Sequence, residues 1–374
     1  MKRVLGHALL FGALVLAACA APSAAPAPTP SGGARASDAP PAPATAAPRS
    51  PSPPASTATP VPASVKFGLQ RTVSLAGVFV AQDKGYFREQ GLELEFEILT
   101  AGSDIMTQVG AGNLHAGSGS GASLFNGFAR GLDIKIIGST QQNDPAGEAA
   151  NTIVVRADLL DSGAVRELRD LQGRKVAVNA RGVASEYIVD RLVRLDGITV
   201  DDVELVPIPF PDMTAALTNR VIDAAFITEP YLTQAETLGV ARRIAPNQPA
   251  GEQITVLLVN TGFVRANPEA DVRFMTAYLR AARELYGEGW NRDDIVAILE
   301  KYTLLPGDII RRSVKPYIDP NGRINLASLE AQQRYFLEHG FLQYRELIPT
   351  SVMVDTRVAE EAVRRLGGEF QAGR

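Results

Sequence analysis

Few residues of this chain are suited to catalysis or to metal binding. The 374 residues include one Cys, Cys19, and three His, at positions 7, 115 and 339. A single Cys excludes an intrachain disulfide and a Cys-based zinc cluster, and three scattered His do not make a metal site. None of the motifs G-x-S-x-G, H-E-x-x-H, G-x-G-x-x-G or the P-loop occurs. We therefore expect no catalytic residue, no metal and no other cofactor.

The side chains that could bind a ligand lie in five loops, each of which follows an expected strand. In open α/β sheets, ligands bind beyond the carboxyl ends of the strands, and this selects residues 70–74, 118–123, 141–144, 179–185 and 228–231. Three of these loops lead into helix N-termini, where free N–H groups and the helix dipole favour an oxyanion or a carbonyl oxygen. The candidate ligand-binding residues are Gln70, Arg71, Ser74, Ser118, Ser120, Asn143, Asp144, Asn179, Arg181, Ser185, Tyr187, Glu229 and Tyr231.

The charged members of this set leave the type of ligand open. Arg71 and Arg181 are the only cations in the five loops, and each could instead be solvated or paired with a carboxylate. Glu229 and Asp144 argue against a pocket built purely for anions. The Ser residues of the loops could equally cap their helices.

An alternation of strand and helix patterns from Val65 onward must position these loops. Residues 92–98 alternate apolar and acidic side chains without a break, which is typical of a strand with one face in solvent. In Gly-Tyr-Phe at 85–87, the Gly should end a helix and the two aromatic side chains should pack under the following strand. A second alternating series begins at Lys175. The alternation predicts mostly parallel sheets with helices on both faces.

The two series share a local pattern, which favours two similar lobes. Residues 106–120 and 213–230 each run from a helix through a tight turn into a buried strand and a polar loop. The β-rich segment 253–260 would carry the chain back. This pattern predicts a two-lobed clamshell, although two unrelated α/β domains would also satisfy it. The expected lobes comprise residues 65–155 with 250–374, and residues 156–249.

The first 64 residues are expected to serve export and anchoring. A basic start followed by an apolar run to Ala18 fits a secretory signal. Residues 16–19, Leu-Ala-Ala-Cys, resemble the bacterial lipobox, in which the Cys is lipidated and becomes the first residue of the mature chain. A plain secretory signal with an incidental Cys is the alternative. We expect a signal peptide at 1–18 and, at 19–64, a lipidated Cys19 with a disordered Ala/Pro/Ser/Thr tether that holds the folded part at the extracytoplasmic face of the cell membrane.

Three stretches carry a resemblance to a known family. They are residues 81–94 (AQDKGYFREQGLEL), 170–178 (DLQGRKVAV) and 223–231 (DAAFITEPY). In order and spacing they resemble the solute-binding proteins of ABC importers in the sulfonate, nitrate and thiamine-precursor superfamily, and the likeness extends over about 65–345. The resemblance implies a class II periplasmic-binding-protein fold, with two α/β lobes, a ligand cleft and a hinge. It also implies a monomer that delivers a small molecule to a membrane permease and its ATPase. The formal net charge of −4 argues against a nucleic-acid partner.

Two ligand classes remain open within this family. A flat heterocycle would need aromatic faces, which Tyr187, Phe210 and Tyr231 could supply, with carboxylate and amide partners for ring N–H groups. A small oxyanion, such as a sulfonate, nitrate or bicarbonate, would need Arg side chains and helix N-termini. Pyrimidine-precursor binders usually carry a Trp and an Asn–His pair in the first loop, whereas residues 70–75 read Gln-Arg-Thr-Val-Ser-Leu and the only Trp is Trp290. We therefore predict riboflavin first and a thiamine-type pyrimidine second, with the oxyanion as the alternative.

Two functions other than solute transport are also compatible with a resemblance to this superfamily. The same superfamily includes a cytosolic pyrimidine synthase with a Cys-rich motif, and this chain lacks that motif because its one Cys lies in the lipobox-like segment. A tethered ligand-sensing partner of a membrane receptor would use the same fold and the same cleft. A neighbouring permease gene would favour the transport function over the sensor.

Overall fold

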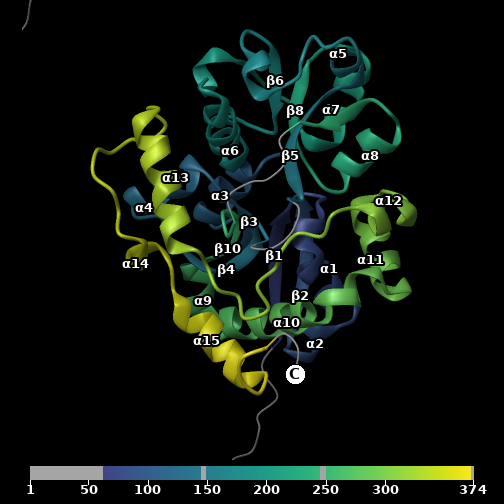
Figure 1. Ribbon diagram of the computed structural model, residues 1–374. Helices are drawn as coiled ribbons and strands as arrows, with labels where there is room; N and C mark the ends of the chain where they lie inside the picture. Colours follow the sequence, from purple (N-terminus) through teal and green to yellow (C-terminus); the bar gives the residue numbers. More distant parts are fainter. Residues whose placement is uncertain (1–61, 145–148, 245–249, 372–374) are drawn as a thin grey trace, which may run out of the picture. The chain divides into compact units, whose positions relative to one another are not determined.

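The computed structural model describes residues 62–144, 149–244 and 250–371. The expected signal peptide, Cys19 and almost all of the tether lie outside these residues. The described residues belong to one compact unit and form two sheets (Figure 1).

The first sheet has five strands and mixed direction. Its order is β2 (Leu92–Ile98), β1 (Ala63–Leu69), β3 (Ala116–Gly119), β10 (Gln253–Asn260) and β4 (Ile134–Gln142). Strand β1 pairs in parallel with β2 and β3, whereas β10 runs antiparallel to both β3 and β4. The strand that returns late in the sequence is therefore inserted between two strands made early.

The second sheet repeats this arrangement. Its order is β7 (Glu204–Pro207), β6 (Lys175–Val178), β8 (Ala224–Thr228), β5 (Asn151–Arg156) and β9 (Ala241–Arg243). Strand β6 pairs in parallel with β7 and β8, and β5 runs antiparallel to β8 and β9. In each sheet the antiparallel strand next to the parallel set is the one that has just crossed from the other lobe. The expectation of two similar α/β lobes is confirmed, and each sheet is mixed.

Helices connect and cover the strands, as the alternating sequence pattern predicts. In Figure 1, helices α5 to α8 surround the second sheet, and α10 lies below the first sheet in this view. Helix α10 packs against both α1 and α15. The helices are α1 (Ala76–Asp83), α2 (Tyr86–Glu89), α3 (Gly102–Gly110), α4 (Ala122–Ala129), α5 (Ala157–Asp161), α6 (Ala184–Val193), α7 (Phe210–Thr218), α8 (Tyr231–Thr237), α9 (Thr261–Ala266), α10 (Ala270–Glu284), α11 (Asp293–Thr303), α12 (Gly307–Arg312), α13 (Leu326–Glu338), α14 (Thr350–Met353) and α15 (Thr356–Arg365).

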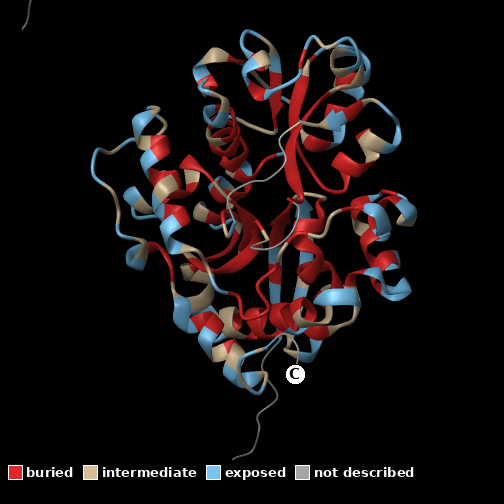
Figure 2. Ribbon diagram, in the orientation of Figure 1, coloured by how far each residue is buried: buried red, intermediate tan, exposed pale blue. Residues whose placement is uncertain are grey.

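The core follows from apolar residues at strand and helix periods. Figure 2 shows buried residues concentrated along the strands and on the inner sides of the helices, and all five residues of β8 are buried. Strand β2 buries Leu92 and exposes its Glu residues on the alternate positions. Gly85 has a φ of 79°, which lets the chain turn between α1 and α2, and the Phe87 ring lies 4.8 Å from that of Phe274. The Gly-Tyr-Phe stretch is structural, as expected.

The lobe boundary differs from the sequence-based expectation at the first crossing. We expected residues up to 155 to belong to the first lobe. Strand β5 instead pairs with β8 and β9, and its continuous run of five buried residues completes the second sheet rather than the first. The chain therefore crosses before Asn151. Among the described residues, no helix is long and apolar enough to span a membrane.

Candidate ligand cavity between the two lobes

A small cavity lies where the two lobes face each other, and it is lined from both. Its volume is about 50 Å³. One water molecule needs about 10–15 Å³ of cavity volume, so this cavity has room for roughly three to five water molecules. The first lobe contributes Gln70, Thr72, Ser74, Gly102, Gly119, Ser120, Gln141, Ile254 and Thr255, and the second contributes Asn151, Asn179, Val183, Ala184, Ser185, Phe210, Phe226 and Thr228.

Five residues predicted from the sequence line this cavity. They are Gln70, Ser74, Ser120, Asn179 and Ser185. Each follows a parallel strand of its sheet, so the cavity lies at the carboxyl ends of these strands, where ligands of open α/β sheets bind.

The polar groups of the cavity are held in place by one another. Ser185 Oγ donates to Asn179 Oδ1 at 2.7 Å, and this leaves the Asn179 amide nitrogen as its remaining donor group. Ser74 Oγ and Thr72 Oγ1 share a hydrogen bond of 2.6 Å. Ser120 Oγ accepts from the Ala184 N–H at 3.4 Å, which leaves the Ser120 hydroxyl free to donate. The cavity therefore presents preoriented neutral donors.

Helix N-termini add further donors around the same space. Gly102, Ala184 and Phe210 are the first residues of α3, α6 and α7, and all three line the cavity. Ser120 immediately precedes Gly121, the N-cap residue of α4. None of these four helices has a side-chain hydrogen bond at its N-cap. Two of these N–H groups already have acceptors, because Ala184 donates to Ser120 and Ala122 donates to the Gly182 carbonyl. The remaining N–H groups of the first turns and the positive ends of the helix dipoles favour a bound anion or carbonyl oxygen.

The side chains that line the cavity are uncharged. The described lining residues comprise amides, hydroxyls, glycines and apolar side chains, without any Asp, Glu, Lys or Arg. Phe210, Phe226 and Ile254 supply the larger apolar surfaces. No group of three or more His, Cys, Asp or Glu that could hold a metal occurs in the part of the chain that the structure describes.

The two lobes also meet through their backbones beside the cavity. The Ala122 N–H donates to the Gly182 carbonyl at 2.8 Å, next to the contact between Ser120 and Ala184. Gly121 has φ 101° and ψ −171°, a conformation that essentially only Gly adopts. We call residues 120–122 and 182–184 the latch.

Two predicted residues line a second cavity instead. Arg71 and Tyr231 lie around a space of about 130 Å³, which shares Gln70, Thr72 and Phe210 with the first cavity. The Tyr231 hydroxyl donates to the Arg71 carbonyl at 2.9 Å. Burial raises the pKa of Tyr231 to about 12, so the hydroxyl remains a donor at neutral pH.

The predicted cation Arg181 is paired with a carboxylate rather than directed into the cavity. Its Nη2 lies 2.8 Å from Glu186 Oε1, and Glu186 raises the pKa of Arg181. Glu186 Oε2 also accepts from the Gly182 N–H at 2.7 Å. Arg181 does not line the cavity, and the pair it forms with Glu186 supports the latch.

Two more candidates lie behind the cavity walls. The Ser118 Oγ shares a hydrogen bond of 3.0 Å with Thr140, whose hydroxyl in turn donates to Thr255. Tyr187 is buried, and its hydroxyl contacts Glu252 at 3.3 Å and Arg191 at 2.9 Å. Neither side chain reaches the cavity lining, because each already has a protein partner in the core.

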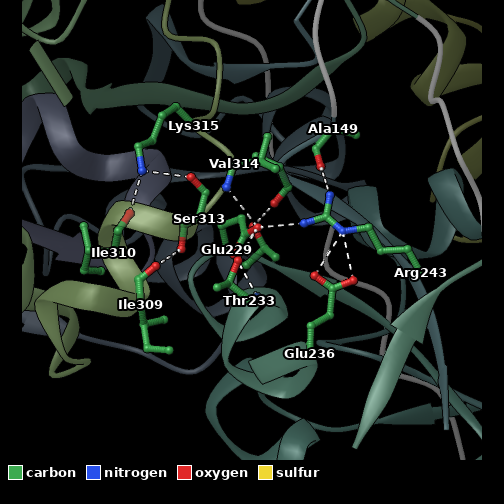
Figure 3. A network of polar contacts seen from close by, with 12 residues as sticks. Ala149, Glu229, Thr233, Glu236, Arg243, Ile309, Ile310, Ser313, Val314 and Lys315 are labelled. Carbon is green, nitrogen blue, oxygen red and sulfur yellow. Dashed lines mark hydrogen bonds and ion pairs between the residues drawn. The ribbon is translucent and has the colours of Figure 1, made fainter. Parts of the chain in front are cut away.

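Glu229 was predicted to bind ligand, but it is the centre of a buried structural network (Figure 3). Its Oε1 lies 3.1 Å from Arg243 Nη2 and accepts from the Val314 N–H at 3.1 Å. Both the N–H and the hydroxyl of Thr233 donate to Glu229 at 3.0 Å. Burial raises the pKa of Glu229, while these donors and Arg243 oppose the shift. The side chain has no exposed surface, and it joins the second lobe to the segment after α12.

Lys315 lies two residues after Ser313, which is drawn with the network around Glu229 in Figure 3. Backbone carbonyls hold the side chain of Lys315. Its Nζ donates to the carbonyls of Ile310, Arg311 and Ser313 at 2.5, 3.0 and 2.8 Å. Burial lowers the pKa of Lys315 to about 8. These contacts fix the turn after α12, against which Glu229 rests.

The remaining candidates, Asn143 and Asp144, lie on the crossing between the lobes. The Asn143 N–H donates to the Glu252 carbonyl at 2.9 Å, and the Gly251 N–H donates to the Asn143 carbonyl at 3.0 Å. Asn143 therefore joins the outgoing and returning segments. Asp144 lines a separate cavity with Trp290 and Lys315.

Several lining residues escaped the sequence analysis as candidates. Asn151, Ile254 and Thr255 lie near the amino ends of β5 and β10. These strands run antiparallel to their neighbours, so their amino ends meet the carboxyl ends of the parallel strands at the cleft edge. The available signals were polar side chains at Asn151 and Thr255 beside the apolar residues of these strands.

A polar cavity between two α/β lobes of matching topology is the arrangement of periplasmic binding proteins, and the expected class II fold is confirmed. The chain belongs to the NMT1/THI5-like family, whose model matches residues 72–288. The nitrate-binding protein NrtA of Synechocystis PCC 6803 has a similar structure, with a TM-score of 0.70 at 14% identity over 83% of this chain and 90% of that one.

Two relatives by sequence bear different names. A protein of Bacillus subtilis (strain 168), whose name provisionally assigns it to aliphatic sulfonates, is 25% identical over 223 residues. A 4-amino-5-hydroxymethyl-2-methylpyrimidine phosphate synthase of Aspergillus parasiticus is 25% identical over 231 residues. The matches cover 58% and 57% of this chain, and 64% and 63% of the two relatives. The chain thus spans less than two thirds of each relative's length.

Proposed function

We propose that this chain is the extracytoplasmic solute-binding subunit of an ABC importer and that it captures a small oxyanion, with a sulfonate as the leading ligand. The observation that carries the proposal is the cavity itself. Neutral hydroxyl and amide donors and the N-termini of α3, α6 and α7 surround it, without a carboxylate in the described lining. Such donors stabilise an anion without a compensating cation.

The same features disfavour the flat heterocycle that the sequence favours as ligand. Glu229 and Asp144, the carboxylates expected to accept from ring N–H groups, do not line the cavity. Of the three aromatics expected to stack on a ring, Phe210 lines the cavity, whereas Tyr187 and Tyr231 do not. A cavity of about 50 Å³ suits a group of a few heavy atoms, and a three-ring flavin is far larger. The names of two similar proteins refer to the binding of aliphatic sulfonates and of nitrate.

An enzymatic function is the second candidate, because the relatives by sequence include synthases. General acid–base catalysis needs a titratable group within hydrogen-bond reach of the substrate. The described lining residues of the cavity have neutral amide, hydroxyl and apolar side chains. These side chains support binding better than proton transfer.

The anchor and the partners belong to the same proposal. Lipidation of Cys19 would confine the binding protein to the membrane surface, and the tether at 20–64 would let it reach a permease with its ATPase. A binding protein that works outside the cytoplasm needs such confinement or an outer compartment.

Calorimetry with a panel of anions tests the function. Methanesulfonate, nitrate and bicarbonate would be titrated into the purified chain, and riboflavin would be followed by quenching of its fluorescence. We expect saturable binding of at least one anion, with a higher melting temperature in its presence; a ligand at about 100 times its Kd adds about 2.7 kcal/mol. Quenching of riboflavin without binding of any anion would refute the oxyanion assignment and restore the heterocycle.

A further inference from the structure

A second cavity opens beside the ligand cavity and differs from it in chemistry. Its volume is about 130 Å³, against about 50 Å³ for the first. Gln70, Thr72 and Phe210 line both, so the two spaces adjoin at these shared residues. A ligand that carries further atoms beside its anionic group could place them in this second cavity.

The walls of the second cavity are mainly apolar and come from both lobes. Ile98 and Leu99 lie on the first lobe, and Pro209 and Pro211 flank Phe210 on the second. The side chain of Ile98 is 51% exposed, and covering it by a hydrocarbon would remove apolar surface from water. These walls favour a short aliphatic segment rather than a polar one.

Arg71 adds a positively charged residue to this mainly apolar lining. It is the one cation among the described residues that line the two cavities. One Nη1–H donates to the Tyr302 carbonyl at 2.7 Å, and the Tyr231 hydroxyl bonds to the Arg71 carbonyl, so both ends of the residue are fixed. A guanidinium has five N–H donors, and no further acceptor for them occurs among the described residues. The unused donors suit a carboxylate or a sulfonate.

We propose that the second cavity holds the aliphatic part of the ligand and that Arg71 pairs with a second anionic group at its far end. The ligand is then a short dianion, with an oxyanion head among the neutral donors and a second acidic group about three carbon atoms away. This inference rests on the proposed function and narrows its substrate class. Arg71 acts as the specificity residue, because the head group binds without it.

Three sulfonates separate the contributions of the anionic head, the aliphatic segment and the second charge to the binding affinity. Methanesulfonate supplies the head, propane-1-sulfonate adds the aliphatic segment, and 3-sulfopropanoate adds the second charge. Calorimetry with the wild-type chain should give affinities that rise in this order, with 3-sulfopropanoate at least tenfold tighter than propane-1-sulfonate. The preference for the dianion should weaken with added salt, because it comes from an ion pair between Arg71 and the ligand.

Substitution of Arg71 tests the ion pair directly. Arg71→Gln should remove the preference for 3-sulfopropanoate while changing the affinity for propane-1-sulfonate by less than about twofold, and Arg71→Lys should keep part of the preference. Arg88→Gln, at an exposed residue of the same lobe, controls for the loss of one positive charge and should leave both affinities unchanged. Melting temperatures would show that each variant folds.

The outcomes distinguish the two proposals. If methanesulfonate binds but the dianion is not preferred, or if Arg71→Gln weakens both longer ligands equally, the role of Arg71 is refuted and the oxyanion function stands. If none of the sulfonates and none of the simple anions binds, the proposed function itself fails.

Discussion

Gly121 of the first lobe lies against Gly182 of the second so closely that a Cβ on Gly121 would come within 2.4 Å of the Gly182 carbonyl oxygen. The same Cβ would lie 2.7 Å from Val183 Cα. Real Cβ atoms do not approach backbone atoms this closely, so the lobes could not keep this contact with any larger residue at 121. The latch therefore depends on the absence of a side chain at the point where the lobes meet.

Gly121→Ala should weaken ligand binding at least tenfold, because the lobes can no longer close against each other beside the cavity. Calorimetry would measure the affinity, and small-angle scattering would show a larger radius of gyration in the presence of ligand. Gly131→Ala is the matched control: Gly131 also has a positive φ, 69°, but its Cβ would meet nothing within 4 Å. Both variants should lose some thermal stability, and equal loss of affinity in both would contradict the latch.

Asn179→Ala should lower anion affinity by about 10- to 150-fold, which corresponds to about 1.5–3 kcal/mol for a hydrogen bond to a charged group. The Asn179 amide is oriented by Ser185 and lines the cavity. Asn113→Ala removes an amide from an exposed turn and serves as the control. An unchanged affinity in Asn179→Ala, measured by calorimetry, would place the anion elsewhere.

Glu229 should make stability depend on pH. Burial raises its pKa above the ordinary 4.5, so as pH rises from 4.5 toward the folded-state value the unfolded carboxyl loses its proton before the folded one. The unfolded state then binds fewer protons, and the stability of the folded state falls over this window. In Glu229→Gln this contribution is absent. The variant should therefore gain stability relative to the wild type between pH 4.5 and pH 7, as measured by urea unfolding at both values. A constant difference would show that the contacts from Arg243, Thr233 and Val314 cancel the effect of burial.

Cys19→Ser should abolish membrane attachment without changing the fold of the described residues. In a detergent phase-partition experiment, the wild-type chain should enter the detergent phase and the variant the aqueous phase. Retention of the variant in the detergent phase would refute lipidation at Cys19.

The tether should be dispensable for folding, and the structure sets where it can be cut. A chain that begins at Pro62 keeps all of β1 and should retain the melting temperature of the chain that begins at Cys19. A chain that begins at Val65 loses Ala63 and Ser64, which pair with Leu92 and Glu93, and should melt at a lower temperature. A lower melting temperature for the Pro62 chain would show that residues 19–61 stabilise the lobes.

Much of the fold could be predicted because local patterns agree with the tertiary structure. The alternation in Leu92–Ile98 defines β2 with its bounds as expected, and the repeated patterns at 106–120 and 213–230 contain β3 and β8, which occupy the same position in the two sheets. Loops after parallel strands correctly contributed Ser120, Asn179 and Ser185 to the cavity.

The roles of the charged residues could not be predicted in the same way. A loop position does not reveal which way a long side chain turns, and that depends on partners brought in by the fold. Glu229 meets Arg243 and Val314, and Tyr187 meets Glu252, through contacts between different elements. The sequence alone does not indicate that these side chains point away from the cavity.

The position of the antiparallel strands in the sequence also determines the order in which the two sheets can form. All strands of the second sheet lie between Asn151 and Arg243, so that sheet has every strand once the chain has been made to Arg243. The first sheet must wait for β10, which pairs with both β3 and β4. Until then these two strands have unpaired edges, which are prone to association with other chains. A chain that folds during its synthesis or export would therefore finish its second lobe first and leave the first lobe open between β3 and β4.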